Sequence, residues 1–312
     1  MTTRYEVSNS EITTWKTCRR KWWLSYYLQL RPVKKDWVGP LPLGSRVHKA
    51  LERYYRDGID LLAAHQELVN EARAHMAVEG LDTAKLDDEA ELGRLMLEGY
   101  LDWVAEEGLD EDLELLGVEE VLKYEFPLER GVITLMGKID QRVLKRFTNT
   151  RAVLDLKTAA SFNIWNDIAH MSPQLKTYML LDKLTAMRDG DERRIDGGIF
   201  RLLRKVKRGP RATPPFYEDM YVTHNDFVLR SFWIQLSGVL QELYDVKAAL
   251  DSGADPMRVA HPNPTRDCRW ACAFFSICHM FDDGSNVEGA LEDQFEAVDP
   301  YDYYGDKDHG DD

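Results

Sequence analysis

Two opposite charges interrupt a buried, strand-like run in the stretch AVLDLKTAA, which covers residues 152–160. Asp155 and Lys157 are two residues apart, so on a strand both side chains leave from the same face. Burying such charges costs several kcal/mol per ion unless each one has a partner. The stretch therefore predicts either an ordinary surface ion pair or a site in which a ligand completes the pair.

Other polar residues favour the site. Asp140, in the stretch GKID, interrupts a second strand-like run, and a hairpin between the two runs would bring it close to Asp155. His48 lies on an early helical segment, with Glu52 on the same helical face. Two carboxylates and an imidazole predict a site for Mg²⁺, or for Mn²⁺ because of the imidazole. Such an ion would hold a water near Lys157, whose ammonium could stabilise developing charge or, with a lowered pKa, help to remove a proton.

Four short motifs, GSRVHKALE, GKID, LDLKT and QLKTY, follow one another along the chain. In this order and at this approximate spacing they resemble the RecB-like nucleases of the PD-(D/E)XK superfamily, and the resemblance covers about residues 8–281. It implies that His48, Asp140 and Asp155 bind the catalytic metal ion and that the backbone carbonyl of Leu156 adds a ligand. It also implies that Lys157 is the catalytic lysine.

The fourth motif, QLKTY, and two basic segments are candidates for binding the substrate. The resemblance implies that Gln174 and Tyr178 contact DNA near the scissile phosphate, although by itself QLKTY is an ordinary turn of an amphipathic helix. Residues 18–35 and 201–211 are strongly basic, and they could follow a single strand or simply be solvated surface. The basic candidates for DNA binding are Arg201, Arg204 and Lys205.

The four cysteines form a further candidate site. Cys268, Cys272 and Cys278 lie within eleven residues, and Cys18 stands 250 positions before the first of them. An intracellular chain rarely keeps disulfides, so metal binding is the leading interpretation. The arrangement resembles that of the AddB-type and CRISPR-associated Cas-four-type exonucleases, which implies a 4Fe–4S cluster that joins the N- and C-terminal segments. Three residues separate Cys268 from Cys272 where two are usual, so Zn²⁺ and unligated buried thiols stay open as alternatives.

The elements that must position these residues alternate along the chain. Helical patterns come first, including an insertion at about residues 59–110. Three strand-like runs, a helix with Ser172 as N-cap and Pro173 at its first position, a strand and a long helix follow. We expect an α/β protein with a restriction-endonuclease-like PD-(D/E)XK core of helix, three strands, helix and strand. The predicted strands and the last helices cover residues 119–128, 132–145, 152–157, 172–187, 197–206 and 224–251.

The charge distribution separates a body from a tail. Residues 282–312 hold twelve acidic residues and one lysine, so they carry most of the net charge of −14 and leave −3 for residues 1–281. We expect one nuclease domain over residues 1–281, with the cluster segment at 268–278. The acidic tail, residues 282–312, is predicted to be disordered, and it could bind a recombination or replication partner.

The sequence also limits the class of protein. It contains no run of about 18 apolar residues and no N-terminal signal pattern, so we expect a cytoplasmic protein with no membrane partner, of bacterial or bacteriophage origin. The predicted function is that of a metal-dependent deoxyribonuclease, an exonuclease on single-stranded DNA ends in recombination or repair. The alternative is a non-cleaving iron–sulfur subunit that binds DNA within a recombination or CRISPR-like complex.

Overall fold

The structure is a computed structural model, and it describes residues 3–304. The sequence predicts one domain over residues 1–281, whereas the chain divides into two compact units. Two long strands, β3 (Leu113–Pro127) and β4 (Val132–Lys145), pass from one unit into the other. The first unit contains residues Met1–Lys35, Lys123–Gly137 and Ser231–Asp312, and the second contains Asp36–Leu122 and Lys138–Arg230.

The second unit is built on a mixed sheet. Its centre is β5 (Thr150–Ala159), which pairs antiparallel with the end of β4 and parallel with β6 (Ile195–Arg204). A further strand, β7 (Tyr217–Thr223), pairs antiparallel with β6, and β3 pairs with β4. The sequence pattern did not predict β7, because its charged residues break the apolar alternation that marks a half-buried strand.

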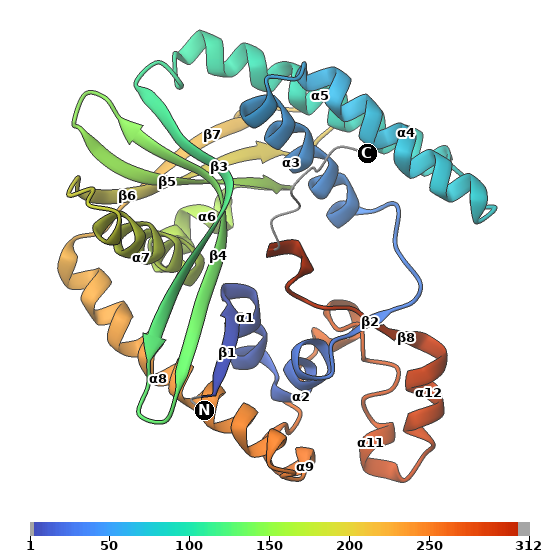
Figure 1. Cartoon of the computed structure of the whole chain (residues 1–312). Helices are drawn as coiled ribbons and strands as arrows, with labels where there is room; N and C mark the ends of the chain where they lie inside the picture. Colours follow the sequence, from blue (N-terminus) through green and yellow to red (C-terminus); the bar gives the residue numbers. More distant parts are fainter. Residues whose placement is uncertain (1–2, 305–312) are drawn as a thin grey trace, which may run out of the picture. The chain divides into compact units, whose positions relative to one another are not determined.

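Helices cover both faces of this sheet (Figure 1). On one face, α3 (Pro40–Asp57) and α5 (Ala84–Glu107) bury their apolar stripes against side chains of β5 and β6, among them Leu154 and Ile199. On the other face lies α7 (Pro173–Arg188), where Leu175 packs so closely on Gly198 that no side chain would fit there. Ser172 caps α7, as predicted. The short helices α6 (Asn163–Ile168) and η2 (Ala169–Met171) lead from β5 to α7.

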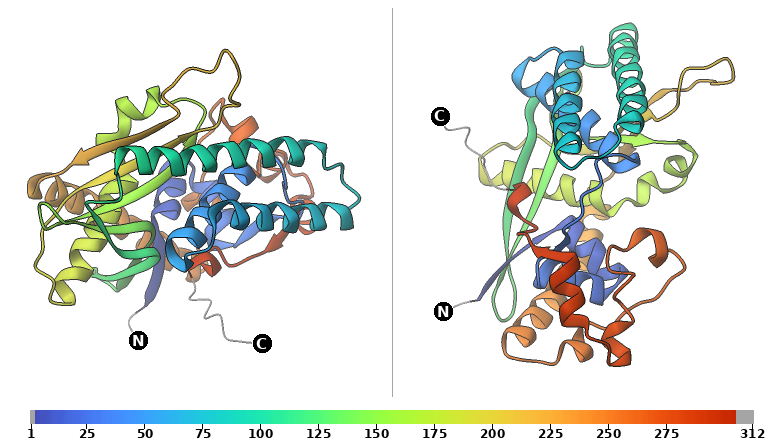
Figure 2. Two further views of the ribbon diagram at one scale, coloured as in Figure 1. Left: turned by 90° about the horizontal axis from the view of Figure 1, so that it is seen from above. Right: turned by 90° about the vertical axis from the view of Figure 1, so that its right-hand side faces the viewer.

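Two helices occupy the segment for which the sequence predicts a helical insertion. They are α4 (Leu61–Val78) and α5, and Figure 2 shows them side by side as two long rods. Their contact is close at one point, because a Cβ added to Gly93 of α5 would lie 2.4 Å from Nε2 of His65 on α4. His65 is buried, and its Nε2 has no hydrogen-bond partner among the described residues.

The first unit gathers both ends of the described chain. Its β1 (Arg4–Ser8) pairs parallel with the start of β4, and β2 (Leu30–Pro32) pairs antiparallel with β8 (Phe295–Ala297). Buried Glu11 is a polar centre of this unit: it accepts hydrogen bonds from Trp22 and Tyr301, and Lys247 lies 2.9 Å from it. The remaining elements are α1 (Asn9–Thr17), α2 (Arg19–Trp22), η1 (Trp23–Tyr27), most of α8 (Asp226–Asp251), α9 (Pro256–Val259), α10 (Cys268–Ala271), α11 (Met280–Asp283), α12 (Val287–Gln294) and η3 (Asp302–Tyr304).

The acidic segment differs from its prediction. We expected residues 282–312 to remain unpacked, but over residues 282–304 they contribute to α11, α12, β8 and η3. The reason is that its few apolar residues are placed to pack: Phe295 is buried against Phe274, and Leu291 joins the same cluster. Residues 305–312 lie outside the described residues.

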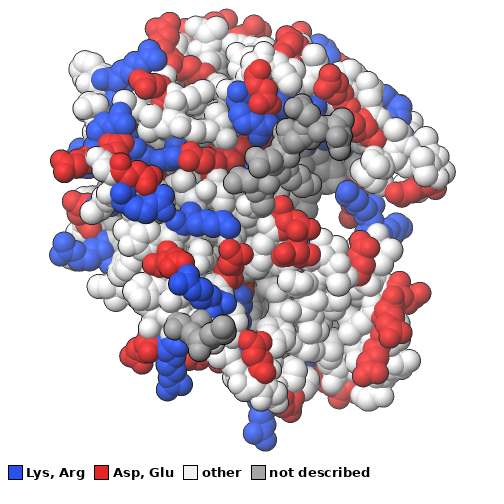
Figure 3. Space-filling view, viewed as in Figure 1, with Lys and Arg blue, Asp and Glu red and all other residues white. Residues whose placement is uncertain are grey.

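The surface carries both signs of charge. Figure 3 shows Lys and Arg side chains interspersed with Asp and Glu on the viewed face, with acidic side chains gathered over α12. No helix within residues 3–304 combines the length and the apolar character needed to cross a membrane.

We predict that His65 makes the free energy of unfolding depend on pH. Burial, and secondarily Arg46, lowers the pKa of His65 from 6.5 to about 4. Its contribution to stability is therefore complete above pH 6.5 and is lost as the pH falls towards 4, a change of about 2–3 kcal/mol. Urea unfolding of His65→Gln should show a smaller loss of stability over this range than wild type. His75→Gln, at an exposed position on the same helix, should behave like wild type; equal pH dependence in all three proteins would contradict the prediction.

Candidate active site

The candidate site begins where β4 and β5 separate. Their pairing ends at Gln141 and Leu154, one residue before Asp140 and Asp155. Beyond that point Asp140 Oδ2 accepts a hydrogen bond of 2.7 Å from the backbone N–H of Leu156. A carboxylate thus takes the place of a ladder partner, and the separation of the strands makes room for polar side chains.

Asp155 and Lys157 lie on one face of β5 and form an ion pair. Lys157 Nζ is 2.6 Å from Asp155 Oδ2. The side chain of Asp155 is only 1% exposed, and this Oδ2 has no partner with normal hydrogen-bond geometry among the described residues. The negative charge of Asp155 is therefore compensated by the nearby ammonium of Lys157, but the two groups are poorly aligned for a hydrogen bond.

His48 reaches the same place from α3. Its Nδ1 lies 3.8 Å from Asp140 Oδ2. One turn earlier in the helix, Gly44 faces β5, where an added Cβ would lie 2.9 Å from the hydroxyl of Thr158. The glycine in the motif GSRVHKALE therefore allows α3 to approach β5 closely enough for His48 to meet Asp140. The helix begins at Pro40, because Pro40 takes the first helical position.

The electrostatics of these four side chains are unusual. Burial, and then the charge of Asp155, raises the pKa of Asp140 well above its usual value, and burial likewise raises the pKa of Asp155. Burial and the nearby Lys157 and Lys205 lower the pKa of His48 to about 4, so its imidazole is neutral at pH 7. Burial alone would lower the pKa of Lys157, but the charges of Asp155 and Asp140 together raise it. The protein by itself thus leaves a deficit of positive charge between the two carboxylates.

Two further charged residues lie beside the site, and the sequence analysis did not select them. Glu119 of β3 is paired with Lys138 of β4 at 3.0 Å, and the charge of Glu119 also raises the pKa of Asp140. Glu119 has φ of 51°, which costs a residue with a side chain on the order of 1 kcal/mol. Lys138 could have been noticed, because it stands within GKID two residues before Asp140. Nothing in the local sequence distinguishes Glu119 from its neighbour Glu120.

The basic residues predicted to bind DNA are placed differently from one another. Arg201 is fully buried, where its guanidinium pairs with Asp219 at 2.8 Å and with Asp110 at 2.8 Å. This corrects its selection: a strand periodicity places Arg201 in the core, and its charge is neutralised there. Half-buried Arg204 donates to the carbonyls of Ala160 and Thr213.

Lys205 is the basic candidate nearest to the site. Its Nζ donates to the carbonyl of Pro40 at 3.2 Å, and its charge contributes to the lowered pKa of His48. On α7, Gln174 Nε2 donates to the hydroxyl of Tyr178 at 3.0 Å, so the predicted motif residues do share one helical face. Tyr178 is largely buried and Gln174 is half-buried.

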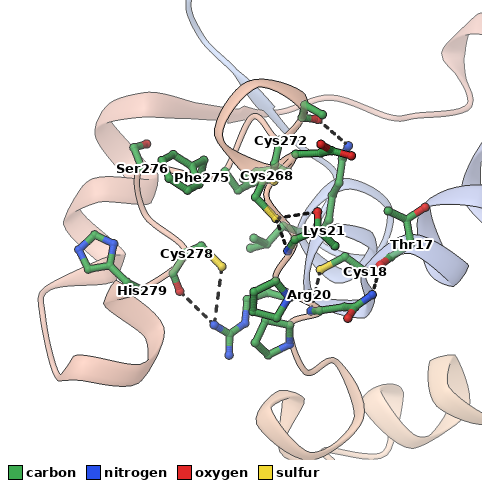
Figure 4. Close-up of a pocket in the computed structure, with 18 of the residues that line it drawn as sticks. Thr17, Cys18, Arg20, Lys21, Cys268, Cys272, Phe275, Ser276, Cys278 and His279 are labelled. Carbon is green, nitrogen blue, oxygen red and sulfur yellow. Dashed lines mark hydrogen bonds between the residues drawn. The ribbon is translucent and has the colours of Figure 1, made fainter.

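The four cysteines meet in the first unit. All four line one cavity of about 820 Å³, together with apolar side chains such as Leu24 and Phe274. Figure 4 shows Cys18, Cys268 and Cys278 directing their sulfur atoms towards a common space. Within residues 3–304, however, no three His, Cys, Asp or Glu side chains are arranged to hold one metal ion as they lie.

Polar hydrogens surround the sulfur atoms of this cavity. The backbone N–H of Asn263 donates to Cys18 Sγ, and that of Thr265 donates to Cys268 Sγ. Arg20, almost completely buried, binds Asp282 through two hydrogen bonds and the carbonyl of Cys278 through a third, and it reaches Cys278 Sγ at 3.9 Å. The N-terminal and C-terminal cysteine segments are therefore joined by a guanidinium as well as by packing.

Comparisons with known proteins give the family of this chain. The family model of the PD-(D/E)XK nuclease superfamily matches residues 6–279, and none of the curated proteins matches the chain. Among solved structures, SSO0001 is 16% identical over 79% of this chain and 87% of its own, with a TM-score of 0.30. A proposed exonuclease from Eubacterium rectale is 11% identical over 86% of this chain and 88% of its own, with a TM-score of 0.48. Because the family model spans most of its length, this chain belongs to the PD-(D/E)XK nuclease superfamily.

Proposed function

We propose that this protein is a divalent-metal-dependent deoxyribonuclease. The observation that carries the proposal is the pair of buried carboxylates, Asp140 and Asp155, brought together where β4 and β5 separate and flanked by Lys157 and His48. Membership of a nuclease superfamily supplies the reaction class, hydrolysis of a phosphodiester bond.

The donor types at this site suit a divalent cation, although as they lie no three acid or imidazole side chains within residues 3–304 are arranged to hold one ion. Asp155 Oδ2 is buried without a well-aligned partner, two carboxylates carry raised pKa values, and the imidazole of His48 is held neutral. We propose that His48, Asp140, Asp155 and the carbonyl of Leu156 hold Mg²⁺ or Mn²⁺. When bound, the ion would polarise the phosphate and supply hydroxide at neutral pH.

The protein's own groups then have separate tasks. Lys157 stays protonated at neutral pH because both carboxylates raise its pKa, so its ammonium can stabilise the negative charge that grows on the phosphate. The hydrogen bond from the Leu156 N–H fixes the orientation of Asp140. Gln174 and Tyr178 of α7 are proposed to contact the strand near the scissile phosphate.

For the cysteine cavity we propose a 4Fe–4S cluster on Cys18, Cys268, Cys272 and Cys278. A single Zn²⁺, with Zn–S bonds of about 2.3 Å, would draw its four sulfurs to within about 4 Å of one another. A four-iron cluster spaces its thiolates more widely, and all four cysteines line one cavity of about 820 Å³, towards which Cys18, Cys268 and Cys278 direct their sulfur atoms. The N–H groups aimed at the sulfurs support the same choice, since such hydrogen bonds stabilise cluster thiolates.

The preferred substrate in this proposal is the end of a single-stranded DNA, processed in recombination or repair. The resemblance to the iron–sulfur exonucleases supports this finer choice. A non-cleaving DNA-binding subunit would have no need of the intact set of His48, Asp140, Asp155 and Lys157.

The first prediction concerns Lys157→Ala. It should lower kcat for a labelled single strand with Mn²⁺ by about 10²–10³-fold, because one cation facing the phosphate is lost. Lys145→Ala is a matched control, since Lys145 is a partly buried lysine of β4 that is paired with Asp196. Cleavage by Lys157→Ala at the wild-type rate would exclude the assigned role. No cleavage by the wild-type protein with Mg²⁺ or Mn²⁺ would favour the non-cleaving subunit.

A second prediction separates metal binding from folding. Asp140→Asn removes one of two buried, mutually repelling charges but keeps an oxygen for the Leu156 N–H. Its Tm in EDTA should equal or exceed that of wild type, whereas the rise in Tm on adding Mn²⁺ should vanish. Asp196→Asn, a control in the same unit, should keep the Mn²⁺-dependent rise. An undiminished rise in Asp140→Asn would remove Asp140 from the metal site.

A third prediction concerns the cysteines. Protein purified without oxygen should be brown and contain about four iron and four sulfide per chain. Cys278→Ser should lose iron and lower the yield of folded protein, because the cluster joins distant segments of the first unit. One zinc and no iron in the wild-type protein would replace the cluster by a zinc site.

A further inference from the structure

Glu119 has an unusual backbone conformation for a residue inside a strand. Its φ of 51° lies in the left-handed region, whereas β3 continues on both sides of it. A strand residue in this conformation redirects its side chain away from the regular alternation. The result here is that the carboxylate of Glu119 is turned inwards and is only 7% exposed.

The carboxylate of Glu119 is paired with Lys138, which lies on β4 close to Asp140. Lys138 Nζ lies 3.0 Å from Glu119 Oε2. Lys138 precedes Asp140 by two residues on β4, so both side chains leave from the same face of the strand. Lys138 therefore lies beside Asp140 along β4 and keeps part of its side chain, 14%, accessible to solvent.

The other charged side chains near Glu119, which belong to α3, form ion pairs with one another. Glu52 and Lys49 of α3 both act on it, and these two residues form their own ion pair at 2.7 Å. Glu52 is held a second time by Arg56. Because Lys49, Glu52 and Arg56 of α3 pair with one another, Lys138 is the cation that Glu119 holds beside Asp140.

We propose that Lys138 is a substrate-binding residue that contacts a backbone phosphate next to the scissile one, and that Glu119 is the residue that positions it. This inference rests on the proposed nuclease function. Lys157 faces the reacting phosphate, and Lys138, farther along β4, would hold the neighbouring phosphate of the same strand. A purely structural ion pair would not require a strained residue, because a regular strand conformation at Glu119 would cost less.

The test measures how salt affects the use of a labelled single-stranded oligonucleotide. For Lys138→Gln we expect KM to rise about tenfold with little change in kcat, because a phosphate contact strengthens binding in both ground and transition states. The slope of log(kcat/KM) against log[KCl] should become shallower by about 0.7, the value for one phosphate contact on a single strand. Lys138→Arg should restore the slope, since it keeps the charge.

Lys145→Gln is the matched control. Lys145 lies on the same strand and is similarly exposed, 18%, in an ion pair with Asp196. It should leave both KM and the salt slope unchanged. An unchanged salt slope in Lys138→Gln would overturn the proposal, and so would an equal change in Lys145→Gln.

The role of Glu119 is tested by a double-mutant cycle. Glu119→Gln alone should raise KM, because Lys138 is no longer held in place. In the Lys138→Gln background the same substitution should have no further effect. Glu120→Gln, at the adjacent residue that pairs with Arg142, is the control. Full additivity of Glu119→Gln and Lys138→Gln would show that Glu119 does not act through Lys138.

These outcomes are distinct from a failure of the nuclease proposal itself. If the wild-type protein does not cleave, fluorescence anisotropy with the same oligonucleotide in EDTA still gives the salt slope of binding. The phosphate contact of Lys138 is then supported if Lys138→Gln lowers that slope and overturned if it does not.

Discussion

The mutual repulsion of Asp140 and Asp155 is the constraint on which the site depends. Two carboxylates are held at the point where β4 and β5 part, in a place too dry for water to screen them. The protein offers one ammonium, Lys157, against two acids, and it keeps the nearby imidazole neutral. Such an arrangement is costly for the ionised protein, which is why the pKa values of both carboxyl groups are raised. Close packing of α3 on β5 at Gly44 and the hydrogen bond from Leu156 keep the groups in place against that repulsion.

The first unit solves a different problem, that of joining the two ends of a long chain. It does so with buried polar contacts as well as with apolar packing. Glu11 accepts hydrogen bonds from Trp22 and Tyr301 and pairs with Lys247, whereas Arg20 donates hydrogen bonds to Asp282 and to the carbonyl of Cys278. Each of these contacts joins the N-terminal segment to residues more than 200 positions away, except that of Trp22. Loss of one partner would leave a buried charge unpaired, so these contacts hold the segments around the cysteines together.

Basic residues serve several purposes in this chain. Arg201 neutralises two acids inside the second unit, Lys157 faces the carboxylates, and Lys205 donates a hydrogen bond to the carbonyl of Pro40 at the start of α3. All three lie on strands or at a strand end, and two of them, Arg201 and Lys205, come from the same basic segment. The role of each residue depends on the direction of its side chain and on the acid or carbonyl that lies nearest to it. A count of charges in the sequence gives neither.

Local patterns in the sequence determined much of this protein. Capping by Ser172, the helices before and after the strands, and the motifs around His48, Asp140, Asp155 and Lys157 were predictable, because periodicity and spacing act over a few residues. Membership of the superfamily follows from those motifs. Only the tertiary structure decided which charges are buried: Arg201 is paired in the core, and Glu119 is turned inwards towards Lys138. Tertiary contacts also decided that residues 282–304 pack, because Phe295 pairs with Pro32 of β2 and Tyr301 binds Glu11, both far away in the chain. Burial and pairing depend on residues distant in sequence, and no local pattern carries that information.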